Sequence, residues 1–234
     1  MSNEQRQGRR GLVWLVVAAA VTIVLWRVPG GNYILYPFTI LATWFHEIAH
    51  GLAALLLGGS FKKLVILSDG SGVAYYSGPL LFGRIGQALV AAAGPLGPPL
   101  AGAALILSSR NPRHASLSLY LLGAFMVIST VIWVRSLFGF IVIPMIGLLV
   151  LAVAAKGSAS LRGFAVQFLG VQACISTYLQ INYLFTYSAG PLGISDTGQI
   201  QQLLILPYWF WGGLIMVLSL FVLLKCLQMA YRSP

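Results

Sequence analysis

The sequence predicts an all-α polytopic membrane protein with about six to seven transmembrane helices and a small membrane-associated β-hairpin. Composition is the first reason: 59% of the 234 residues are hydrophobic and only 8% are charged, whereas soluble domains are about one quarter charged. The second reason is that apolar stretches long enough to cross a bilayer, about 20 residues each, follow one another with short polar interruptions. The whole chain, residues 1–234, is therefore interpreted as a single transmembrane domain.

Basic residues set the expected partners and orientation. The net charge is +10, but the Lys and Arg residues stand at the ends of apolar runs, where lipid headgroups would meet them. We therefore expect a lipid bilayer and no nucleic acid as partner. A slight excess of basic residues on the side of the N-terminus favours a cytoplasmic N-terminus, with residues 1–10 as a basic tail. The small architecture favours the bacterial inner (plasma) membrane.

Seven apolar runs are predicted to span the membrane: 11–28, 34–57, 85–107, 117–134, 138–155, 163–186 and 207–231. Only residues 135–137 separate the fourth run from the fifth, so these two could instead form a re-entrant pair. In the third run, the glycines and prolines between Gly94 and Pro99 are expected to break or loosen the helix and to admit water.

Two interruptions between these runs have structure of their own. In the segment 60–78, β-branched and aromatic residues flank Asp69-Gly70 and Ser71-Gly72, which is the turn chemistry of a β-hairpin. In the loop 187–206, Ser195 or Asp196 can cap a short helix that runs toward Pro207. We expect the hairpin to lie beside the membrane and the loop to return to it.

The second run contains the pattern that indicates chemistry. His46 and His50 are four residues apart, which places both imidazoles on one helix face about one turn apart, as a two-point grip for a metal. Glu47, next to His46, is placed to act as general base toward a water molecule. Zinc suits nitrogen and oxygen ligands in an open catalytic site. Such polar residues inside a span are costly unless they bind something or each other, as in a structural hydrogen-bonded cluster.

A third protein ligand is sought among the few remaining polar residues. Asp69 opens a tight turn, for which its turn chemistry is a sufficient reason, and His114 lies in a basic loop that would face lipid headgroups. Asp196 remains, in an otherwise uncharged loop at the start of a helix, with simple helix capping as the alternative role. The predicted zinc ligands are therefore His46, His50 and Asp196.

Three local patterns resemble the site-two-protease-like membrane zinc metallopeptidases, in particular their compact bacterial branch. They are the zinc-binding helix from His46 to Gly51, the glycine-proline motif of residues 93–96, and the late proline-containing segment from Pro191 to Gly198. The hairpin also follows the zinc-binding helix, as it does in that family. The resemblance implies hydrolysis of a peptide bond within or near a transmembrane segment, with Glu47 as base and Asp196 as third zinc ligand. Thr197 interrupts the family's Asp-Gly pair.

The same family often places Asn residues near the site, where they can hold an unwound substrate strand. Ser188 stands at one position where an Asn would be expected. Asn182, at the polar end of the sixth run, is predicted to substitute as a substrate-binding residue, and an interhelical hydrogen bond is its alternative role.

The predicted function is that of an intramembrane zinc metalloprotease whose partner is a membrane-protein or peptide substrate. The alternatives are a non-proteolytic zinc-binding scaffold, a transporter, and an enzyme that hydrolyses a lipid-linked or other amide. A transporter would need further intramembrane acids for coupling, which this chain lacks. A scaffold would have no reason to keep Glu47.

Overall fold

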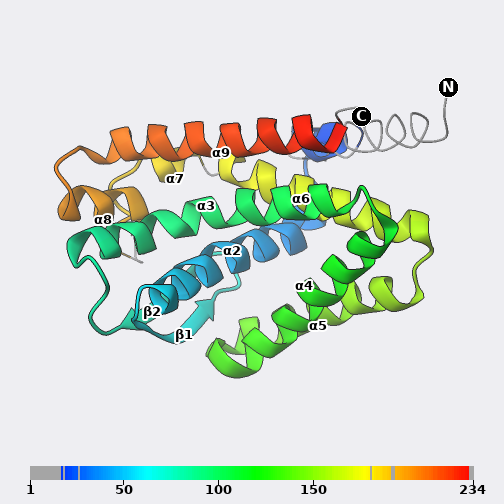
Figure 1. Ribbon diagram of the computed structural model, residues 1–234, viewed down its shortest axis with the longest axis horizontal. Helices are drawn as coiled ribbons and strands as arrows, with labels where there is room; N and C mark the ends of the chain where they lie inside the picture. The colour runs from blue at the N-terminus through cyan, green and yellow to red at the C-terminus, as the bar shows by residue number, and fades with distance from the viewer. Residues whose placement is uncertain (1–16, 18, 26, 180, 191–192, 232–234) are drawn as a thin grey trace.

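The computed structural model describes residues 17, 19–25, 27–179, 181–190 and 193–231. These residues form helices and one two-stranded sheet (Figure 1). The elements are α2 (Gly31–Leu56), β1 (Ser60–Ile66), β2 (Gly72–Ser77), α3 (Arg84–Ser108), α4 (Pro112–Trp133), α5 (Leu137–Lys156), α6 (Ala159–Leu179), α7 (Ile181–Leu184), α8 (Asp196–Leu203) and α9 (Tyr208–Tyr231).

Among the described residues, the helices α2, α3, α4, α5 and α9 are long and apolar enough to cross a membrane. This confirms the predicted all-α polytopic fold with its small hairpin. Residues 11–16, 18 and 26 of the predicted first span, 11–28, lie outside the described residues, and residues 19–25 within it are helical. The predicted sixth span, 163–186, corresponds to α6 followed by α7. The inward face of α6 carries the buried polar residues Gln172, Ser176 and Thr177, so its hydropathy is lower than that of the five spans.

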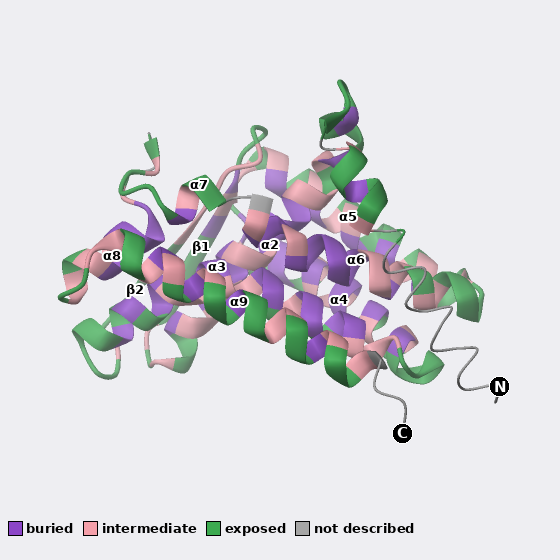
Figure 2. Cartoon of the chain, turned by 90° about the horizontal axis from the view of Figure 1, so that it is seen from above, coloured by how far each residue is buried: buried purple, intermediate pink, exposed green. Residues whose placement is uncertain are grey.

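Helix α2 lies at the centre of the molecule. It contacts α3, α6 and both strands of the hairpin (Figure 1), and Figure 2 shows buried residues gathered on it. Trp44, fully buried in α2, donates a hydrogen bond of 3.1 Å from Nε1 to the buried Ser129 Oγ of α4. A side-chain hydrogen bond between buried partners fixes one helix against the next. The outward faces of α9 carry exposed apolar side chains, as expected of a helix that meets lipid.

Helix α3 is continuous from Arg84 to Ser108 although it contains Pro95, Pro98 and Pro99. The sequence predicts that these residues break or loosen the third span; the predicted break was wrong, and the loosening stays a prediction. A proline removes the hydrogen bond to the carbonyl four residues earlier, so Pro99 leaves the Pro95 carbonyl without its helical donor. The hydroxyl of Thr177 on α6 donates to this carbonyl at 3.5 Å. A side chain of the neighbouring helix thus replaces the lost donor, which is how membrane helices tolerate proline.

Helices α4 and α5 form an antiparallel pair. Each is long enough to cross a membrane by itself, which favours two full spans over the re-entrant alternative. The short link between them pairs with the hairpin: Arg135 N donates to Leu64 O at 2.8 Å, and Ser136 Oγ donates to Ile66 O at 2.8 Å. This link covers the outer edge of β1.

The hairpin follows α2 as the sequence predicts. Its strands are antiparallel, with a register that runs from Ser60 opposite Ser77 to Ile66 opposite Gly72. The turn between them lies along α2, because the Thr43 hydroxyl donates to the Gly70 carbonyl at 2.6 Å and the Tyr36 hydroxyl bonds to the carbonyl of Ser68. Gly70 has a φ of 90°, a conformation that favours glycine. The hairpin therefore folds back along α2, with its turn beside the middle of that helix.

Candidate metal and catalytic site

The buried part of α2 carries the two histidines and the glutamate of the predicted motif. The helix runs without interruption through this motif, so His46 and His50 lie one turn apart, with ring centroids 4.9 Å from each other. Their side chains are 12% and 10% exposed, and Glu47 is also buried. Helical spacing alone therefore presents two imidazoles on the same face of the helix, one turn apart.

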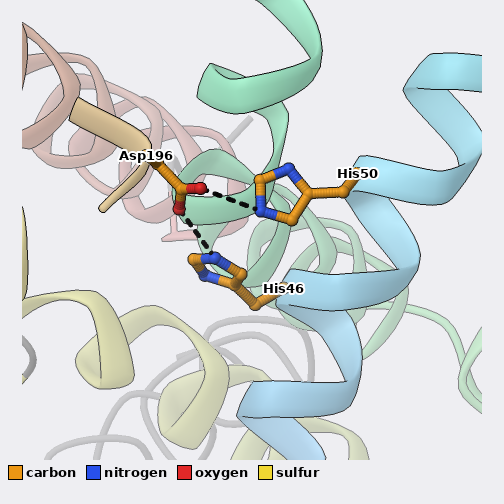
Figure 3. Close-up of side chains that lie close together, drawn as sticks. All are labelled: His46, His50 and Asp196. Carbon is orange, nitrogen blue, oxygen red and sulfur yellow. Dashed lines mark hydrogen bonds and ion pairs between the residues drawn. The ribbon is translucent and has the colours of Figure 1, made fainter. Parts of the chain in front are cut away.

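The short helix α8 supplies the third side chain. Ser195 caps this helix by accepting a hydrogen bond of 3.1 Å from Gly198 N, and Asp196 occupies the first turn. Asp196 Oδ2 lies 2.9 Å from His46 Nε2, and its Oδ1 lies 3.2 Å from His50 Nε2 (Figure 3). One ligand atom from each residue lies within 4.8 Å of the others. The fold thus brings together the three side chains that the sequence singles out, although 150 residues separate His46 from Asp196.

Two contacts with α3 make the group of His46, His50 and Asp196 suitable for binding a metal ion. The Val90 carbonyl lies 2.7 Å from His50 Nδ1, so this nitrogen carries the proton and Nε2 presents its lone pair, as in most metal-binding histidines. A Cβ atom at Gly94 would lie 2.1 Å from His50 Nε2 and 2.7 Å from His46 Nε2. Only glycine lets α3 approach this closely. The two nitrogens and the carboxylate oxygen form a donor set that zinc accepts.

Tyr183 of α7 completes the surroundings of Asp196. Its hydroxyl donates to Asp196 Oδ2 at 3.2 Å, and its ring lies 6.0 Å from that of His46. Hydrogen bonds of this kind orient ligating carboxylates. Sequence reasoning missed this residue. Its position near the end of the predicted sixth run, 13 residues before Asp196, is the only sequence signal that points to it.

A cavity of about 450 Å³ opens beside these residues. It is lined by His46, Glu47, His50 and Asp196 together with residues of the hairpin and of the segment that precedes α8, and we call it the site cavity. The start of β2 lies against Glu47, because a Cβ atom at Gly72 would be 2.9 Å from Glu47 Cγ. A carboxylate, two imidazoles and residues of β2 therefore line the same cavity.

The remaining residues considered from the sequence lie apart from the metal group. Asp69 opens the hairpin turn and accepts a hydrogen bond of 2.9 Å from Ser71 N, as predicted for a turn residue. His114 is exposed in the first turn of α4. Asn182 is exposed in α7 and does not line the site cavity, whereas its neighbour Tyr183 does. Substrate binding by Asn182 stays a prediction.

Comparison of the sequence with models of known protein families identifies the family of this chain. The model of the Peptidase M50B-like family matches residues 14–226 of the chain. The chain belongs to this family. Membership in the M50B-like family confirms the predicted kinship with site-two-protease-like membrane metallopeptidases and supports a peptidase activity. Placement of this M50B-like chain in a compact bacterial branch stays a prediction. Neither the curated proteins nor the solved structures contain a match.

Proposed function

We propose that this protein is an intramembrane zinc metalloprotease that hydrolyses peptide bonds in or near transmembrane segments. The observation that carries the proposal is the convergence of His46, His50 and Asp196 within 4.8 Å, in a cavity that Glu47 also lines. Membership in a metallopeptidase family supports the same conclusion. We place this activity in the bacterial inner membrane.

In this proposal His46, His50 and Asp196 hold the ion. Zinc supplies, when bound, a Lewis acid that polarises a carbonyl group and activates water. Val90 and Tyr183 keep the proton-bearing nitrogen of His50 and the carboxylate of Asp196 in their orientations. The ligand side chains are largely buried, and all three line the site cavity, where the substrate and the reacting water would meet the ion.

Glu47 acts as the general base. Its carboxylate takes a proton from the water molecule whose oxygen forms a bond to the scissile carbonyl carbon. It then delivers this proton to the amide nitrogen as the carbon–nitrogen bond breaks. Glu47 lies next to His46 along α2 and lines the site cavity. A base in this position serves a reaction in the cavity without ligating the ion.

The substrate is proposed to pair with β2. The link between α4 and α5 covers the outer edge of β1, so among the described residues the outer edge of β2 is the strand edge that a peptide could pair with beside Glu47. Backbone pairing with an edge strand holds an extended peptide with little dependence on its sequence. Exchange of the hairpin for an unrelated one without loss of cleavage would contradict this pairing.

Metal content and hydrolysis, measured together on detergent-purified protein, test the proposal. We expect about one equivalent of zinc in the wild type and in Asp69→Ala, and a loss of zinc in Asp196→Ala. Glu47→Gln should keep the metal but cleave a transmembrane peptide about 100-fold more slowly or worse. A wild-type protein that binds no zinc would refute the proposal. A wild-type protein that binds zinc but cleaves no peptide would favour the scaffold alternative.

A further inference from the structure

A carboxylate outside the metal group also faces the site cavity. Asp69, in the hairpin turn, lines this cavity and is exposed. The other acids among the described residues, Glu47 and Asp196, are buried. Among the described residues, Asp69 is therefore the one acidic side chain that lines the cavity, is exposed and takes no part in the proposed metal and catalytic site.

The hydrogen bonds of the turn engage only one of the two oxygens of the Asp69 carboxylate. Ser71 donates to Asp69 from its backbone N at 2.9 Å and from its hydroxyl at 2.6 Å, and both bonds go to Oδ1. These hydrogen bonds lower the pKa of Asp69 below its ordinary value of 3.8, so the group is anionic at neutral pH. No Lys or Arg forms an ion pair with it among the residues that the structure describes. The turn thus holds a negative charge in place and leaves it without a countercharge.

The depth of this charge is unusual for a turn residue. The neighbouring Gly70 is bonded to Thr43, at the middle of the membrane-spanning α2. An acid at the depth of a span is costly unless it faces water or meets an opposite charge. Asp69 lines the site cavity, and no opposite charge from the described residues neutralises it, so it remains free to pair with a cation.

Asp69 lies close enough to Glu47 for a cationic side chain of a bound substrate to reach it. Gly72 lies against Glu47, and Asp69 precedes Gly72 by three residues, which corresponds to at most about 10 Å of chain. An extended peptide advances about 3.3 Å per residue. A peptide whose scissile bond lies at Glu47 would therefore bring a side chain about two to four residues away to Asp69.

We infer that Asp69 forms a subsite for a cationic side chain, Lys or Arg, that lies about two to four residues from the scissile bond of the substrate. This inference rests on the proposed proteolytic function. It narrows the substrate class to transmembrane segments with a basic residue close to the cleavage position. Pairing with Asp69 would offset the cost of bringing such a residue into the membrane.

Substitution of Asp69 by Asn tests whether the negative charge of Asp69 selects the substrate. The side-chain oxygen of Asn also accepts the hydrogen bonds of an Asx turn, so Asp69→Asn removes the charge and keeps the turn. The substrates are transmembrane peptides that differ at one position, with Lys, Gln or Glu two to four residues to either side of the cleavage position. Ser71→Ala serves as the matched control, since it weakens the turn but keeps the charge.

The wild type should cleave the Lys peptide with a kcat/KM about fivefold above that of the Gln peptide, and the Glu peptide more slowly still. Asp69→Asn should remove this preference, Asp69→Lys should reverse it, and Ser71→Ala should keep it. The preference should also weaken at high ionic strength, because salt screens exposed charges. The same Lys-to-Glu ratio in wild type and Asp69→Asn would overturn the inference.

Peptide binding separates this inference from the proposed function. The affinities of the same peptides are measured with the Glu47→Gln variant and with the double variant that also carries Asp69→Asn. If the wild type cleaves none of the peptides, the proposed function fails. Tighter binding of the Lys peptide that is lost with Asp69→Asn would still support the cationic subsite. Equal affinity for the three peptides would refute the cationic subsite.

Discussion

Substitution of Gly94 by Ala tests the metal site through the closest approach between α2 and α3. The added Cβ atom would lie 2.1 Å from His50 Nε2, whereas ordinary van der Waals contact begins at about 3.4 Å. The imidazole would have to withdraw by about 1.3 Å, but its Nδ1 is bonded to the Val90 carbonyl. A displacement of this size exceeds the tolerance of about 0.2 Å expected for metal–ligand distances. We therefore expect zinc affinity to fall by about 100-fold or more.

The assay is competition for zinc between the purified protein and a chelating dye, together with thermal unfolding in the same detergent. Overpacking at Gly94 should cost about 1–3 kcal/mol of stability, so a folded variant with a weakened site is expected. Gly213→Ala is the matched control: Gly213 also lies in a membrane-spanning helix, but a Cβ atom there would meet nothing within 4 Å. Wild-type zinc affinity in a folded Gly94→Ala protein would refute this description of the site.

Two further substitutions test neighbouring contacts. Tyr183→Phe removes the hydroxyl that donates to Asp196 Oδ2 at 3.2 Å and should weaken zinc binding about tenfold, with little change in the unfolding temperature; an unchanged zinc dissociation constant would contradict the positioning role. Ser129→Ala leaves the buried Nε1 of Trp44 without its acceptor and should lower the free energy of unfolding by about 1 kcal/mol. Its zinc content should stay at the wild-type level, and a loss of zinc would show that the contact between α2 and α4 also shapes the site.

Much of the fold was predictable because its signals are local. Length and hydropathy of each run predict a membrane-spanning helix without knowledge of its neighbours, and the pair Asp69-Gly70 predicts the hairpin turn from its own backbone preferences. Ser195 similarly predicts the start of α8, where its hydroxyl accepts from Gly198 N. The prediction failed at the prolines of α3, because the donor that replaces the lost hydrogen bond comes from Thr177 on another helix.

The site also has a part that local sequence signals predict and a part that they do not. The spacing of His46 and His50 implies two imidazoles on one helix face, and the scarcity of acids in the chain directs attention to Asp196. Tyr183 and Val90 have no comparable signal, since their roles arise from distances to residues far away in the sequence.

The sequence by itself determined that the protein is a membrane protein, that α2 carries a metal-binding pattern, and that the late loop supplies an acid. These conclusions depend on composition and on spacing within single elements, which tertiary packing does not alter. Only the tertiary structure decided that Asp196 meets both imidazoles, that Gly94 must lack a side chain, and that Asp69 and Glu47 line one cavity. The physical reason is that each of these features is a contact between elements, and its distance follows from how the helices pack.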